Sequence, residues 1–251
     1  MTPIPSGTEI ILRTAVGSTV HGTAVESQDD RDEMAIGIEP EGYVIGLQEW
    51  ETTVFRTQKE GVRSGPGDLD LVTHSLRKFA RLAAKGNPTI LLPLFTPDDA
   101  IIKNTSFGNF LIKHRDLFIT KSAGRAFQGY LKAQKDRLLG IKGQMRTNRR
   151  ELVDKYGFDT KYAGHVIRLG YQGVELMTTG LLSLPMKEMH RDTVVKIRMG
   201  GLSFEAVMEL ANRLERELKH ALDHSTLPEE ANIGSINQLL SVMYKSMWSK
   251  T

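Results

Sequence analysis

The sequence contains no cysteine, so disulfides, thiolate zinc sites and cysteine nucleophiles are excluded from its chemistry. It also has no apolar run long enough to cross a bilayer. The opening segment, MTPIPSGTEI, lacks the basic stretch and apolar core of a signal peptide. We therefore expect a cytoplasmic protein without a membrane partner. There is no dinucleotide-type Gly-x-Gly-x-x-Gly after a strand, no Walker-type Gly-Lys-Ser/Thr and no Gly-x-Ser-x-Gly elbow of a serine hydrolase.

The composition is that of an ordinary globular protein. Of its 251 residues, 40% are hydrophobic and 25% are charged, which suits one large domain or two small ones. The formal net charge is only +3, but residues 26–49 are acidic and residues 132–155 are basic. The basic segment contains Arg146, Arg149 and Arg150 and is a candidate path for a nucleic-acid backbone. A solvated, charge-rich helix end is the alternative interpretation.

The spacing of apolar residues predicts a small β-sheet followed by a helical half. Strands are expected at 9–16, 32–38, 43–47, 52–57 and 68–74. Helices are expected from Ser75 to about Gly86, and at 104–116, 121–143, 158–178, 203–224 and 233–248. The sequence thus predicts an α+β protein with a small mixed β-sheet domain over residues 1–95 and an α-helical domain over residues 96–251.

Three aspartates suggest a metal site. Side chains at positions i and i+2 of a strand share a face, so Asp30 and Asp32 point the same way. Asp70 can supply a third carboxylate from another strand, with Asp68 as its alternative on the same face. Such carboxylates repel one another unless a hard cation lies between them. We therefore expect them to bind two Mg²⁺ ions, or Mn²⁺ in their place.

A Gly-Ser pair shortly before the aspartates fits the same chemistry. Gly17 allows a close approach of the backbone, and Ser18 offers a hydroxyl and an N–H group to a phosphate. Each feature alone is more often structural, since an acidic cluster after a strand is usually a solvated turn. Their order, namely strand, Gly-Ser, Asp-x-Asp and a later Asp, favours the functional interpretation. Asp29 faces the other side and is expected to be structural.

This order resembles the polymerase-β-like nucleotidyltransferase superfamily. Residues 70–88, DLVTHSLRKFARLAAKGNP, and 161–180, KYAGHVIRLGYQGVELMTTG, look like segments of a predicted branch associated with RNA ligases and RNA repair. The chain departs from the family pattern at His21, where the family has an aromatic residue, and after Asp32 and after Pro88. These departures leave the metal ligands in place.

The resemblance implies roles for individual residues. Asp30 and Asp32 would bind both metals, Asp70 would complete the catalytic metal site, and Ser18 would bind a nucleotide phosphate. The family's helical motif is matched by three residues that would reach toward the nucleotide: Lys161, His165 and Arg168. Their spacing of four and three places them on one helix face, and an exposed basic face is the alternative. Arg77, just past Asp70, would contact phosphate or cap the strand-to-helix turn.

These features predict a nucleotidyltransferase that moves a nucleoside monophosphate from an NTP to an acceptor hydroxyl and releases pyrophosphate. The favoured acceptor is an RNA 3′ end, such as that of tRNA. A protein side chain or a small molecule is the alternative acceptor. A third hypothesis is a nucleotide-binding sensor without catalysis, which the three metal-facing aspartates argue against. The sequence predicts no particular oligomeric state.

Overall fold

The computed structural model describes residues 3–25, 29–59, 61–139 and 149–249. The chain forms two compact units: unit 1 comprises Met1–Phe118 and Glu230–Thr251, and unit 2 comprises Ile119–Glu229. The compact units therefore divide after Phe118, and the residues from Glu230 onward belong with the sheet. The expected division into functional domains at residue 95 stays a prediction.

Unit 1 is built on a mixed five-stranded sheet with the strand order β3-β4-β2-β1-β5. Strands β2 and β4 are parallel, and the other neighbouring pairs are antiparallel. The elements of unit 1 are β1 (Glu9–Ala15), α1 (Gly17–His21), β2 (Arg31–Ile38), η1 (Glu41–Tyr43), β3 (Thr52–Arg56), β4 (Leu69–Ser75), α2 (Leu76–Ala84), η2 (Leu92–Leu94), η3 (Asp98–Ala100), β5 (Ile101–Asn104), α3 (Ser106–Lys113), η4 (Arg115–Phe118) and α9 (Ile233–Trp248). The predicted α+β class with a mixed sheet is confirmed.

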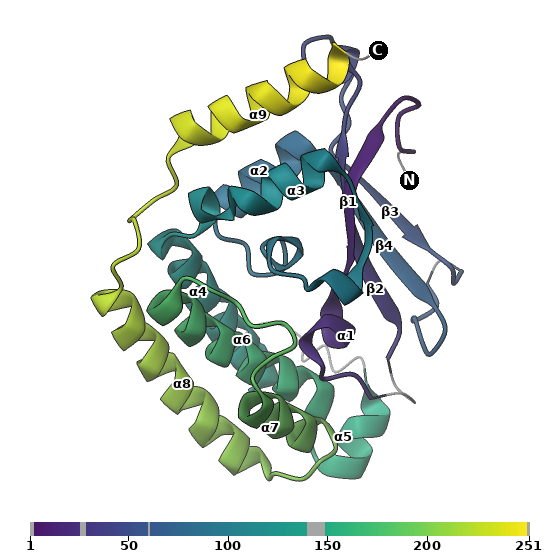
Figure 1. The fold of residues 1–251 in the computed structure, drawn as a ribbon. Helices are drawn as coiled ribbons and strands as arrows, with labels where there is room; N and C mark the ends of the chain where they lie inside the picture. The colour runs from purple at the N-terminus through teal and green to yellow at the C-terminus, as the bar shows by residue number, and fades with distance from the viewer. Residues whose placement is uncertain (1–2, 26–28, 60, 140–148, 250–251) are drawn as a thin grey trace. The chain divides into compact units, whose positions relative to one another are not determined.

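Helices α2, α3 and α9 lie on one face of this sheet (Figure 1). Helix α2 begins where β4 ends, because the Ser75 side chain accepts a hydrogen bond from the Lys78 N–H at 3.1 Å and caps the helix. The apolar face of α2 buries Phe79 completely. Burial of this face stabilises the unit more than helix propensity does.

Helix α9 is attached to the rest of the sheet unit through the buried residue Glu39. The Tyr244 hydroxyl donates to Glu39 Oε2 at 2.7 Å, and the Trp248 indole N–H donates to the Glu39 carbonyl at 3.0 Å. The Tyr244 oxygen also accepts from the Arg77 N–H at 3.1 Å. Burial, followed by the neighbouring Glu39 carboxylate, raises the pKa of Tyr244 above its ordinary value. The phenol therefore stays protonated and can donate to Glu39.

Unit 2 is helical and comprises α4 (Lys121–Leu138), α5 (Arg150–Tyr156), α6 (Thr160–Thr179), α7 (Glu188–Arg198) and α8 (Phe204–His224). Helix α6 is its centre and packs against α4, α7 and α8. A glycine permits this close packing: a Cβ added at Gly173 would lie 2.9 Å from Leu218 and 3.1 Å from Phe127. In the described part of the chain, no helix combines the length and apolarity needed to span a membrane.

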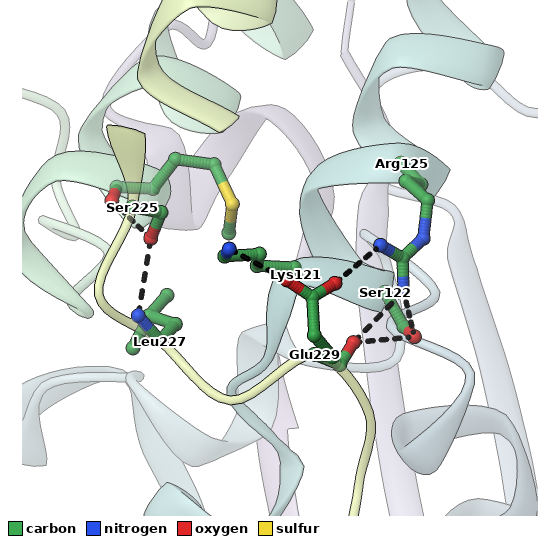
Figure 2. A network of polar contacts seen from close by, with 7 residues as sticks. Lys121, Ser122, Arg125, Ser225, Leu227 and Glu229 are labelled. Atoms are coloured by element: carbon green, nitrogen blue, oxygen red, sulfur yellow. Dashed lines mark hydrogen bonds and ion pairs between the residues drawn. The ribbon is translucent and has the colours of Figure 1, made fainter. Parts of the chain in front are cut away.

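The last residues of unit 2 are fastened to the start of α4 (Figure 2). The Lys121 N–H donates to the Pro228 carbonyl at 2.8 Å. The Glu229 carboxylate accepts from Lys121 Nζ at 2.6 Å and from Arg125 at 3.2 Å, and these hydrogen bonds lower its pKa. Arg125 also donates to the Glu229 carbonyl at 2.8 Å. The two ends of unit 2 are thus held side by side.

Several sequence expectations were wrong in detail. The strand expected at 43–47 is instead the end of a short 3₁₀ helix, η1, followed by a loop. In this loop Ile45 is 72% exposed and Leu47 is fully exposed. Residues 101–104 form strand β5, and the helix expected at 104–116 is shortened to α3 followed by η4. Helices α1, α5 and α7 were not expected. The helix expected at 121–143 ends at Leu138, before residues 140–148, which lie outside the described residues.

Candidate metal and nucleotide site

The sheet brings the three predicted aspartates together. Asp32 and Asp70 are direct partners in the parallel pairing of β2 and β4, so their side chains share a face of the sheet. Asp30 lies just before β2. One carboxylate oxygen from each of the three residues lies within 4.8 Å of the other two. Among the described residues, this is the one group of three or more Asp, Glu or His side chains close enough to hold a metal ion.

The chemistry of this group suits a hard divalent cation. Three half-buried carboxylates at this distance repel one another, and the repulsion is larger than it would be in bulk water. A divalent ion with oxygen ligands, such as Mg²⁺, removes the repulsion and is bound by the same atoms. The three donors therefore fit such an ion.

Gly17 is packed directly against one of these carboxylates. Its φ of +66° is in the left-handed region, and a Cβ added there would lie only 2.2 Å from Asp32 Oδ2. The neighbouring Val16 N–H donates to the Asp32 carbonyl at 2.9 Å. The Gly-Ser pair therefore lies beside the aspartates, as expected, but as the start of helix α1 and not as a turn. Ser18 is half-buried in the first turn of that helix.

The third carboxylate is Asp70 and not its alternative Asp68. Asp68 accepts hydrogen bonds from the Gly65 N–H at 2.9 Å and from the Thr57 hydroxyl at 2.8 Å, and these bonds, the first more than the second, lower its pKa. Asp68 therefore stabilises the loop between β3 and β4 and stands outside the group of three. Asp29, expected to be structural, accepts from the Val25 N–H at 2.6 Å.

The loop between β3 and β4 supplies partners of Asp70 that the sequence did not indicate. Gln58 Nε2 donates to Asp70 Oδ1 at 2.9 Å, and the Ser64 hydroxyl donates to Asp70 Oδ2 at 2.9 Å. Arg56, the residue opposite Asp70 in the strand register, forms an ion pair with Oδ2 at 3.7 Å. Gln58 and Ser64 come from a segment rich in turn-forming residues, and nothing in its pattern shows where side chains point.

Arg31 and Glu33 alternate with Asp30 and Asp32 along the chain, so their side chains face the opposite side of the sheet. Glu33 is buried there and accepts from Arg13 Nε at 2.5 Å and from Arg31 Nε at 2.9 Å. This alternation separates a structural carboxylate, which is neutralised by two arginines, from the aspartates on the other face.

Arg77 is not brought to the aspartates. It lies in the first turn of α2, beyond the far end of β4, and Asp70 to Ser75 alone spans ~16 Å of strand. Its guanidinium donates to the Val44 carbonyl at 3.4 Å. Its observed contacts are therefore with the loop after η1 and with α9.

Lys161, His165 and Arg168 lie along helix α6 of unit 2. Arg168 donates to His165 Nδ1 at 2.7 Å and to Gln172 Oε1 at 2.8 Å. Burial, followed by the charges of Arg168 and Arg149, lowers the pKa of His165 to about 3. The imidazole is therefore neutral at pH 7, accepts at Nδ1 and carries its proton on Nε2.

The basic segment has only two of its three named arginines in the described part of the chain. Arg149 is half-buried and pairs with Asp159 at 3.3 Å, while Asp159 caps α6 by accepting from the Tyr162 N–H at 2.9 Å. Arg150 is exposed at the start of α5. Arg146 lies outside the described residues. Arg149 is thus engaged in the structure of unit 2, and Arg150 is the arginine open to a ligand.

Comparison with known proteins gives a family match over nearly the whole chain. The model of a family described as the RNA repair pathway DNA polymerase beta family matches residues 4–242. A search of curated proteins finds no match. Among solved structures, a nucleotidyltransferase-like protein from Exiguobacterium sibiricum is similar, with 14% identity, a TM-score of 0.32, and coverage of 86% of this chain and 69% of that chain.

Proposed function

Because the chain belongs to the RNA repair pathway DNA polymerase beta family and is thus a polymerase-β-like nucleotidyltransferase, we propose the following reaction for it. The protein transfers a nucleoside monophosphate from an NTP to an acceptor hydroxyl and releases pyrophosphate. The reaction depends on Mg²⁺, with Mn²⁺ able to substitute, and the acceptor is an RNA 3′ end such as that of tRNA.

The observation that carries this proposal is the convergence of Asp30, Asp32 and Asp70 beside Gly17. Bound Mg²⁺ would lower the pKa of the attacking hydroxyl and neutralise charge on the triphosphate. Asp30 and Asp32 would bind both metal ions, and Asp70 would complete the catalytic metal site from β4. Ser18 and the N–H groups at the start of α1 bind phosphate, next to the Asp32 carboxylate.

Residues of unit 2 are proposed to contact the nucleotide and the acceptor. Lys161, His165 and Arg168 share a face of α6, and the neutral His165 provides a donor at Nε2. The acceptor proposal is supported by the description of the family and by the basic segment 132–155, in which Arg150 is exposed.

The deciding experiment measures transfer of label from each α-labelled NTP in the presence of Mg²⁺, with and without bulk tRNA. The variants are Asp30→Asn, Asp32→Asn and Asp70→Asn. Removal of one metal-binding carboxylate is expected to reduce turnover by about a thousand-fold or more, because metal stabilisation of the transition state amounts to several kcal/mol. Asp29→Asn is the matched control, since this neighbouring aspartate stands outside the metal group.

The position of the label separates the possible functions. Label on RNA, present with the Asp29→Asn control and lost with the three variants, supports the proposal. Label on a protein or a small molecule keeps the chemistry and replaces the acceptor. Nucleotide binding without pyrophosphate release would instead identify a sensor, and normal turnover in the Asp32→Asn variant would refute the metal site.

A further inference from the structure

The loop between β3 and β4 holds both oxygens of Asp70 at once. Gln58 Nε2 donates to Oδ1 and the Ser64 hydroxyl donates to Oδ2, both at 2.9 Å. Gln58 Nε2 also donates to the Ser64 hydroxyl oxygen. The three side chains form a closed ring of hydrogen bonds, which fixes the rotation of the Asp70 carboxylate.

The donors and acceptors of this ring are fully matched. The Gln58 amide has two N–H donors and uses them on Asp70 and Ser64, while the single Ser64 hydroxyl proton goes to Asp70. The reverse orientation of the amide would place its oxygen against the carboxylate, so the orientation is determined by Asp70. Each carboxylate oxygen accepts more than one bond, and a lone pair on each remains for a metal ion.

The Gln58 side chain gains little stability from its position. Its Oε1 atom is buried and has no hydrogen-bond partner in the described part of the chain. An unsatisfied buried acceptor costs about 1–3 kcal/mol. A glutamine retained for stability alone would satisfy its carbonyl oxygen, whereas this side chain commits both of its donors to the ring around Asp70.

We propose that Gln58 and Ser64 are positioning residues, which orient the Asp70 carboxylate toward the metal before the ion binds. This inference rests on the proposed function, because it assigns a metal to Asp70. A carboxylate with a fixed rotation loses less conformational freedom on binding the ion, so metal affinity is higher. The loop between β3 and β4 therefore serves the metal site, although none of its side chains belongs to the group of three.

The test is a titration of Mn²⁺ followed by electron paramagnetic resonance, with and without a non-hydrolysable NTP analogue. Gln58→Met keeps the approximate size of the side chain and removes both donors, and Ser64→Ala removes the hydroxyl. Ser64→Thr restores the hydroxyl. Thr57→Val is the matched control, because the Thr57 hydroxyl donates to Asp68 and accepts from the Leu69 N–H in the same loop, and neither of these bonds goes to the Asp70 carboxylate.

We expect Gln58→Met and Ser64→Ala to weaken Mn²⁺ binding about tenfold or more, with little change for Ser64→Thr and Thr57→Val. In turnover assays, kcat should fall in the same two variants while KM for the NTP changes little. The melting temperature of Gln58→Met should not fall, because an orphaned acceptor is removed with the donors.

Two results would overturn the inference: wild-type Mn²⁺ affinity in Gln58→Met and Ser64→Ala, or equal weakening in Thr57→Val. Asp70→Asn tests the proposed function separately in the same titration. If Asp70→Asn leaves Mn²⁺ binding unchanged, the metal site itself is wrong. If Asp70→Asn weakens binding and the positioning variants do not, only the role of Gln58 and Ser64 fails.

Discussion

Substitution of Gly17 by alanine should lower turnover strongly while the protein still folds. The new Cβ would lie 2.2 Å from Asp32 Oδ2 and 2.9 Å from Asp32 Cγ. This contact has to open to at least about 3 Å, so the carboxylate must move by roughly 1 Å. A misplacement of this size at a catalytic group lowers turnover about a hundred-fold.

The free energy of unfolding is expected to fall by about 2–3 kcal/mol, as the sum of two contributions. An alanine in the left-handed region costs about 1–2 kcal/mol, and rotation of Asp32 off its preferred angle adds about 1 kcal/mol. Gly7→Ala is the control: Gly7 has a φ of +85° in the same unit, and its added Cβ would meet Pro40 at an ordinary 3.5 Å.

The assay compares label transfer and urea unfolding for the two alanine variants. We expect both to unfold cooperatively, with Gly17→Ala somewhat less stable, and only Gly17→Ala to lose about two orders of magnitude in kcat. Turnover of Gly17→Ala within threefold of Gly7→Ala would refute the link between the glycine and the metal ligand.

Other predictions follow from buried polar groups and from the exposed Arg150. Tyr244→Phe should lower the free energy of unfolding by about 1–3 kcal/mol, because Glu39 and the Arg77 N–H lose a buried partner. Since the folded pKa of Tyr244 is raised, wild-type stability should fall as pH rises above about 10, and this part of the slope should be missing in Tyr244→Phe in urea melts. His165, with a folded pKa of about 3, should remain neutral at pH 5 in an NMR titration, whereas an unfolded histidine is protonated at that pH. A titration of His165 near pH 6.5 would contradict its burial beside Arg168. Arg150→Ala should weaken RNA binding in a filter assay and reduce its salt slope by about one, while an unchanged slope would exclude this arginine from the RNA path.

The sheet and the grouping of the three aspartates were predictable because they follow from the alternation of side chains along strands. Asp30, just before β2, lies two residues from Asp32, and the pairing of Asp32 with Asp70 of β4 completes the group. The apolar spacing of α2, α6, α8 and α9 likewise revealed these helices, since each has one face buried in a core. Gly17 could be identified, but its contact with Asp32 could not, because that contact joins residues on different elements.

The missed elements lack such signals. Helix α7 is charged, and its buried apolar side chains are only Val194 and Ile197, so the apolar spacing is too sparse to identify it. Strand β5 has four residues and is largely exposed. The segment after Pro40 has apolar residues at alternate positions but pairs with no strand in the described part of the chain, and Ile45 stays in solvent. Gln58 could not be identified because loop side chains follow no period.

The attachment of α9 to the sheet has a consequence for the order of folding during synthesis. Glu39 emerges from the ribosome early, but its partner Tyr244 follows 205 residues later. Unit 2, whose two ends are held together by Glu229, can complete its contacts before α9 is translated. The sheet is therefore translated long before the helix that carries the partner of Glu39, so we expect unit 2 to become protease-resistant on the ribosome before unit 1 does.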